Sequence, residues 1–195
     1  VHMVLARVAG DPSDHRGVSL FIVPKNRVDG AGKVLGSNDV TCIGIEEKLG
    51  IHGSATCQLV FGDNDECEGW LIGGQGEGLR CMFKMMNEAR IAVGMQGVAL
   101  SSLAYQKAVR YAKERVQFGR PIGQMQTIQG YLAQMIMELY GADMLTMFSA
   151  FQIDKGRHAR GYVAKAKAFS AETVGHVMDV SSQIFGGMGY MEEQD

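Results

Sequence analysis

The stretch ERVQFGRPIGQMQ, residues 114–126, contains the residues of this sequence whose types and spacing most clearly suggest a chemical role. Arg115 is a permanent cation whose guanidinium can fork onto a phosphate group, and Phe118 offers a flat apolar face. The amide of Gln126 can donate and accept hydrogen bonds. Residues of this kind are unusual at the joint between two apolar helices, so ligand binding is one interpretation of the cluster.

A second candidate stretch is SSQIFGGMGY, residues 181–190. Gln183 adds another amide, and Gly186, Gly187 and Gly189 would let backbone amides come close to a ligand. The alternative is structural, because a glycine-rich run after an apolar helix is also typical of a helix C-cap followed by a turn.

Asn87 and Arg90 are three residues apart and therefore share one face of a predicted helix. They could form a polar clamp for an anionic or amide-bearing ligand, or they could lie on a solvated face.

The loop GGQGEG at residues 73–78 does not match the G-x-G-x-x-G pattern of a dinucleotide site. We interpret it as a flexible joint between domains.

The composition excludes several classes of function. Among 195 residues, 19 basic residues face 21 acidic ones, without the basic stripe of a nucleic-acid binder. The four cysteines lack CxxC spacing and the five histidines are scattered, so we expect no metal site and reduced, partly buried thiols. The longest uncharged stretch, residues 91–106, contains glycines and polar residues and predicts a buried helix, not a membrane span.

The elements that would position these residues change type along the chain. Short branched-residue runs up to about residue 61, separated by turns, predict antiparallel strands. Helical spacing then predicts helices over about 79–115, 126–154 and 159–185, and Pro121 prevents the first from continuing. The residues expected to face the core are Leu79, Met82, Phe83, Met86, Val93, Leu100 and Leu103 in the first helix and Ile128, Leu132, Met135, Leu139 and Leu145 in the second. The fold class is therefore an α+β multidomain fragment: a partial antiparallel β sandwich or barrel at 1–75, followed by an up-and-down helical bundle at 76–195. A fourth helix would lie beyond the chain.

The order and spacing of several motifs closely resemble the acyl-CoA dehydrogenases over almost the whole chain. These motifs are GVSLFIVPK, EEKLGIHGSATCQLVF, NEARIAVGMQGVA, AVRYAKERVQFGRPIGQMQTIQGYLAQM and QIFGGMGYMEE. The resemblance implies the later part of the middle β domain and most of the C-terminal four-helix bundle of a flavoenzyme. Several segments are most similar to the larger members of the family, some of which act on sulfur-containing acyl-CoAs, although ERVQFGRPI is more like the ordinary members.

The resemblance also implies a cofactor and a substrate. Residues of the helix joint would reach FAD held by a dimer neighbour, Asn87 and Arg90 would hold the coenzyme A part of the substrate, and electrons would pass to an electron-transferring flavoprotein. A homodimer or homotetramer is implied. The cofactor residues carried over are Arg115, Gln117, Phe118, Gln126, Gln183, Ile184, Phe185, Gly186 and Gly187.

The implied reaction is α,β-dehydrogenation of an acyl-CoA thioester by a carboxylate base and the flavin. In most members the base is a glutamate beyond the glycine turn, so we expect it beyond Asp195. In a minority it directly precedes the arginine that matches Arg90, but that position is Ala89, and Glu88 is one residue away on a different helix face. We therefore expect a fragment that does not turn over an acyl-CoA by itself.

Two alternatives remain open: an acyl-CoA oxidase-like flavoenzyme that uses oxygen, and a non-catalytic helical module for oligomerisation or binding. For location we expect the bacterial cytosol. The mitochondrial matrix is the alternative, because a transit peptide would lie upstream of residue 1.

Overall fold

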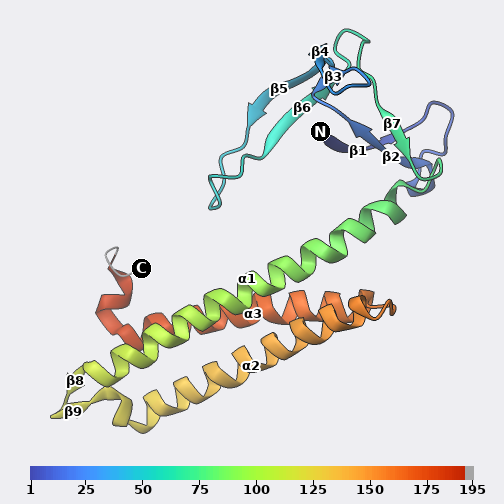
Figure 1. Cartoon of the computed structure of the whole chain (residues 1–195). Helices are drawn as coiled ribbons and strands as arrows, with labels where there is room; N and C mark the ends of the chain where they lie inside the picture. The colour runs from blue at the N-terminus through green and yellow to red at the C-terminus, as the bar shows by residue number, and fades with distance from the viewer. Residues whose placement is uncertain (192–195) are drawn as a thin grey trace. The chain divides into compact units, whose positions relative to one another are not determined.

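The computed structural model describes residues 1–191, which form strands followed by three long helices (Figure 1). The chain divides into two compact units, Val1–Lys84 and Met85–Asp195, and each is described by itself. This arrangement confirms the predicted fold class of a partial antiparallel β unit followed by a helical one.

The first unit contains three small antiparallel sheets. Strands β1 (His2–Arg7), β2 (Val18–Val23) and β7 (Trp70–Ile72) form one sheet in the order β1-β2-β7. Strand β3 (Asn26–Val28) pairs with β4 (Val34–Ser37), and β5 (Val40–Ile45) pairs with β6 (Cys57–Phe61). A short 3-10 helix, η1 (His15–Gly17), precedes β2. The described strands do not close into a barrel.

A buried polar pair organises the loop between β6 and β7. Asn38 is fully buried and donates to the carbonyl oxygens of Pro24 and Glu68, at 2.9 and 2.8 Å. Asp39 has a positive φ of 52° and accepts from the backbone and side-chain amides of Asn64, at 2.7 and 2.8 Å. These bonds replace apolar packing in a unit whose buried aliphatic residues are few.

The second unit contains α1 (Gly78–Glu114) from Met85 onward, α2 (Gln126–Asp154) and α3 (Arg160–Phe185). A two-stranded hairpin of β8 (Val116–Gln117) and β9 (Arg120–Pro121), then the 3-10 helix η2 (Ile122–Gln124), joins α1 to α2. A last 3-10 helix, η3 (Gly186–Tyr190), follows α3. None of the helices in residues 1–191 is apolar enough over a sufficient length to cross a membrane.

The helices meet through small residues. Ala104, Ala108 and Ala112 of α1 pack with Met135 of α2 and Val177 of α3. Nearer the N-terminus of α1, a Cβ on Gly97 would lie 2.8 Å from the carbonyl oxygen of Ser170, so α1 and α3 are nearly in backbone contact there. Buried hydroxyl groups lie in this seam between the helices, where Oγ1 of Thr146 in α2 is 3.3 Å from Oγ of Ser170 in α3.

The predicted inward face of α1 was only partly right: Leu79, Met82, Phe83 and Met86 are half-buried, but the later residues were predicted wrongly. Val93, Leu100 and Leu103 are 42, 47 and 52% exposed, whereas Gly97 and Ala104 are buried. Large side chains cannot occupy a seam in which the backbones approach so closely, so the small residues face inward and the large ones face outward.

The cysteines also differ from expectation. Cys42 and Cys57 are exposed, and only Cys67 and Cys81 are partly buried; all four are free thiols. No cluster of three or more potential metal ligands occurs within residues 1–191.

Candidate functional site

The joint after α1 is held in place by backbone hydrogen bonds. The amide of Arg115 donates to the carbonyl oxygen of Tyr111 at 2.8 Å, and the amide of Ile122 donates to the carbonyl oxygen of Arg115 at 2.9 Å. Between them, Phe118 and Gly119 both have positive φ, 53° and 79°. Such a two-residue loop reverses the chain tightly, so Arg115 and Gln117 stay close to the end of α1.

The end of α3 is anchored next to this joint. Ile184 is 4% exposed and belongs to the same apolar cluster as Ala112 and Ile122. The neighbouring Phe185 ring stacks on Tyr111, with centroids 4.4 Å apart and planes 19° from parallel. Gly186 has a φ of 60° and a ψ of −135°, a conformation that glycine adopts readily, and there α3 ends and the chain turns into η3.

Residues of the two segments line an open hollow of about 540 Å³. Most of the cofactor residues predicted from the sequence therefore lie around one space, although they are far apart along the chain. The predicted residues that line it are Arg115, Gln117, Gln183, Ile184, Phe185, Gly186 and Gly187.

The chemistry of this lining suits a ligand with an anionic part and an apolar part. Arg115 is the one charged residue among the described residues that line the hollow, and Gln117 and Gln183 add amide groups. A Cβ built on Gly186 or Gly187 would meet nothing within 4 Å, so a ligand can approach the backbone there. A diphosphate on a flat ring system fits this donor set.

Two predicted cofactor residues lie outside the hollow. Phe118 is at the tip of the hairpin and 91% exposed. Gln126 is the first residue of α2 and is also exposed. Within this chain neither contributes to the lining, so only contact with a ligand outside the hollow would give them the predicted role.

Asn87 and Arg90 form a separate cluster on α1. The Arg90 guanidinium donates to the Asn87 side-chain oxygen at 3.2 Å, and both residues are half-buried. At about 1.5 Å of rise per residue, they lie about 40 Å along the helix from Arg115. Glu88 and Ala89, between them in sequence, are exposed.

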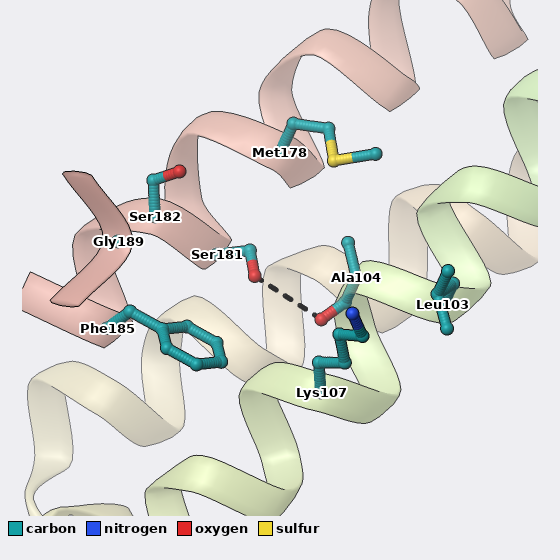
Figure 2. A pocket seen from close by; sticks show the side chains of 8 residues that line it. All are labelled: Leu103, Ala104, Lys107, Met178, Ser181, Ser182, Phe185 and Gly189. Carbon is teal, nitrogen blue, oxygen red and sulfur yellow. Dashed lines mark hydrogen bonds between the residues drawn. The ribbon is translucent and has the colours of Figure 1, made fainter. Parts of the chain in front are cut away.

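A smaller hollow of about 190 Å³ lies between α1 and α3 (Figure 2). Leu103 and Lys107 of α1 line it together with Met178 and Ser182 of α3. The Ser181 hydroxyl donates across the seam to the carbonyl oxygen of Ala104 at 3.3 Å, which fixes the two helices beside it. Of the predicted cofactor residues only Phe185 belongs to this lining, together with Gly189 of the glycine-rich stretch.

Sequence reasoning missed several apolar residues of the larger hollow. Tyr111 could have been found, because it precedes Arg115 by four residues and one helical turn therefore places the two together. No sequence signal marks the others. The missed lining residues are Tyr111, Ile122, Met125, Ile128, Met188 and Met191.

Comparisons with known proteins identify the family. Residues 76–195 match the family described as "Acyl-CoA dehydrogenase, C-terminal domain". The chain is 35% identical to the 3-methylmercaptopropionyl-CoA dehydrogenase of Ruegeria pomeroyi, over 99% of this chain and 36% of the relative. The chain thus spans only about a third of that relative's length.

Two solved structures share the fold. The butyryl-CoA dehydrogenase of Megasphaera elsdenii superimposes with a TM-score of 0.83 at 30% identity, over 99% of this chain and 48% of that one. A chain in a structure of the electron transferring flavoprotein of Acidaminococcus fermentans gives 0.81 at 31% identity, over 97% and 47%. Acyl-CoA dehydrogenases are FAD flavoproteins. The chain described here belongs to the acyl-CoA dehydrogenase family.

Proposed function

We propose that this chain is part of an FAD-dependent enzyme that introduces a double bond between the α and β carbons of an acyl-CoA thioester. The hollow between the helix joint and the end of α3 holds the diphosphate and nucleotide part of FAD. The observation that carries the proposal is the convergence on this hollow of Arg115, Gln183 and the open backbone at Gly186.

Each lining residue has a physical role toward the cofactor. The Arg115 guanidinium can form two parallel charge-assisted hydrogen bonds to a diphosphate, which fix its orientation as well as its charge. Gln117 and Gln183 hydrogen-bond polar groups of the nucleotide, and Ile184 and Phe185 cover its apolar surface. When bound, the flavin supplies the acceptor for the hydride that leaves the β carbon.

Phe118 and Gln126 complete the proposed site from outside the hollow. Because both are exposed at the same end of the helical unit, they would pack against a nucleotide that another subunit holds. The same chain's Asn87 and Arg90 would bind the coenzyme A part of a substrate about 40 Å away along α1. Such a separation is consistent with one chain serving two active centres of a homodimer or homotetramer.

The remaining parts of the proposal rest on the family. The middle β domain would end at residue 75 and the C-terminal helical domain would begin at 76, where the family match begins. Electrons would leave the flavin for an electron-transferring flavoprotein. We place the protein in the bacterial cytosol, and the catalytic base would come from residues beyond Asp195.

Replacement of Arg115 tests the cofactor site. Arg115→Ala removes a charge-assisted pair of about 1.5–3 kcal/mol, so FAD affinity should fall about tenfold to a hundredfold. Arg120→Ala is the matched control, because Arg120 lies in the same hairpin but does not line the hollow. The measurement is quenching of flavin fluorescence during titration of the 195-residue chain.

Two results would overturn the proposed cofactor site. One is equal loss of affinity in Arg115→Ala and Arg120→Ala, which would mean that general positive charge and not the hollow attracts FAD. The other is the absence of saturable FAD binding to the unmodified chain at millimolar FAD. Circular dichroism of each variant establishes that the helices are intact before the affinities are compared.

A further inference from the structure

Two exposed cysteines occupy neighbouring strands of the β5–β6 hairpin. Cys42 of β5 pairs with Leu59, and Cys57 of β6 pairs with Ile45. Side chains two residues apart on a strand point to the same face. Since Leu59 lies opposite Cys42 and two residues from Cys57, both thiols belong to one face of the hairpin.

An irregularity in β5 lies between the rungs that contain the two cysteines. The register shifts between Cys42 and Gly44, so that one extra residue of β5, Ile43, has no partner on β6. The Cys42 thiol donates to the carbonyl oxygen of Gly44, with an Sγ···O distance of 3.4 Å. It therefore leans along its own strand toward the rung that Ile45 and Cys57 form.

The Cys42 side chain also influences the ionisation of Cys57. The pKa of Cys57 is raised above its ordinary value, first by a hydrogen bond with the Cys42 side chain, then by desolvation and by the charge of the Cys42 thiolate. Both residues are exposed, so a small oxidant can reach them from solvent.

We propose that Cys42 and Cys57 are an oxidisable dithiol that closes to an intramolecular disulfide across the β5–β6 hairpin. The oxidant class is a hydroperoxide. One thiolate attacks the peroxide oxygen and becomes a sulfenic acid as the O–O bond breaks, and the second thiol attacks that sulfur and releases water. In total two thiols and one hydrogen peroxide give one disulfide and two waters.

The disulfide would restrain the segment that it brackets. Residues 43–56 connect the two cysteines, and several of their large apolar side chains are exposed, including Leu49 and Ile51. A covalent link at the base of this segment limits its opening from the sheet. Amide hydrogen exchange within residues 43–56 should therefore slow after oxidation.

The reaction should depend on pH in a defined direction. The attacking species is the thiolate, and the raised pKa of Cys57 keeps its thiolate fraction low at neutral pH. The rate of disulfide formation should consequently rise from pH 7 to pH 9.

The test uses the 195-residue chain treated with hydrogen peroxide at stoichiometric amounts. Intact mass should fall by two hydrogen masses, and peptide mapping without reductant should recover Cys42 linked to Cys57. The double variant Cys67→Ser/Cys81→Ser is the matched control and should still lose two hydrogens. Cys42→Ser and Cys57→Ser should each abolish that loss while retaining the circular dichroism of the parent.

Three outcomes would overturn the inference. They are a disulfide that maps to Cys67 or Cys81, a disulfide that links two chains on a non-reducing gel, and retention of free thiols at Cys42 and Cys57 while added peroxide is consumed elsewhere. The readout does not involve FAD or acyl-CoA, so the inference stands or falls independently of the proposed enzyme activity.

Discussion

At the scale of single residues, Asp39 illustrates how a carboxylate can organise a loop. Its oxygens accept from the Asn64 amide at 2.7 Å, from the Asn64 side chain at 2.8 Å and from the Glu66 amide at 3.3 Å. These bonds, the Asn64 backbone amide first, hold the pKa of Asp39 below its ordinary value despite an opposing desolvation. The folded state therefore favours the ionised carboxylate of Asp39.

This lowered pKa predicts how stability depends on pH. The unfolded chain binds a proton at Asp39 more readily than the folded chain does, so stability rises with pH where the unfolded carboxyl is still protonated. The contribution is complete above the unfolded value of about 4 and is lost as pH falls through the lower folded pKa. Urea unfolding between pH 2 and 7 should show this loss.

Asp39→Asn tests the assignment, because asparagine keeps the shape and tolerates the left-handed backbone. The variant should be less stable at pH 7 and should show a weaker loss of stability in acid. Asp63→Asn is the control, since Asp63 is exposed in the same loop. Identical pH profiles for Asp39→Asn and the unmodified chain would contradict the role given to Asp39.

At the scale of elements, the seam between α1 and α3 depends on Gly97. A Cβ there would lie 2.8 Å from the Ser170 carbonyl oxygen, and a backbone atom cannot move away without shifting a helix. Gly97→Ala should therefore destabilise the helical unit by about 1–3 kcal/mol, measured as a lower midpoint of urea unfolding.

Gly175→Ala provides the opposite expectation on the same pair of helices. Gly175 is exposed within α3, and a Cβ there would meet nothing within 4 Å. The better helix propensity of alanine should make this variant more stable by about 0.5–1 kcal/mol. If Gly97→Ala were also stabilising, the close approach of α1 and α3 would be refuted.

The same seam explains which parts of the fold could be predicted from sequence. The ranges of α1, α2 and α3 followed from helical periodicity and from the proline at 121, and Met135 and Leu139 are buried as expected. The prediction that Val93, Leu100 and Leu103 face inward was wrong, because hydrophobic patterns give weight to large side chains. The close contact between α1 and α3 instead requires glycine, alanine and serine. How closely two helix backbones approach depends on tertiary packing and cannot be predicted from the sequence of one helix.

The candidate site was predictable for a different reason. Arg115, Gln183 and Gly186 stood out as chemical types at helix ends, and the fold brings them to one hollow. The apolar residues Met125 and Ile128 that complete its lining look like any core residue, so only the structure assigns them there.

At the scale of the whole molecule, α2 carries an exposed apolar stripe at helical spacing. The exposed side chains recur every three or four residues, which places them on one face. Contiguous apolar surface of this kind is typical of an interaction site. The residues are Met137, Tyr140, Met144, Met147, Phe148 and Phe151, each between 42 and 66% exposed.

We therefore expect the chain to associate with itself through α2. Met147→Glu would place a charge within the stripe and should shift the light-scattering mass of the chain toward that of a monomer. Ala171→Glu adds the same charge at an exposed position of α3 and serves as control. A monomeric parent chain, or equal masses for the parent and Met147→Glu, would contradict self-association through this face.

The final prediction concerns turnover. Asn87 and Arg90, the proposed substrate-binding pair, have Glu88 as their neighbouring carboxylate in sequence, and Glu88 is exposed beside them. A general base must reach the α proton of a bound thioester within hydrogen-bonding distance. A solvated carboxylate on a different helix face from Arg90 does not meet that requirement.

We expect the 195-residue chain with FAD, butyryl-CoA and an artificial electron acceptor to give no enoyl-CoA, while a full-length butyryl-CoA dehydrogenase forms enoyl-CoA under the same conditions. Enoyl-CoA formed by the chain and abolished by Glu88→Gln would make Glu88 the base, and Arg90 would then have to present the thioester on the opposite side from the one proposed here.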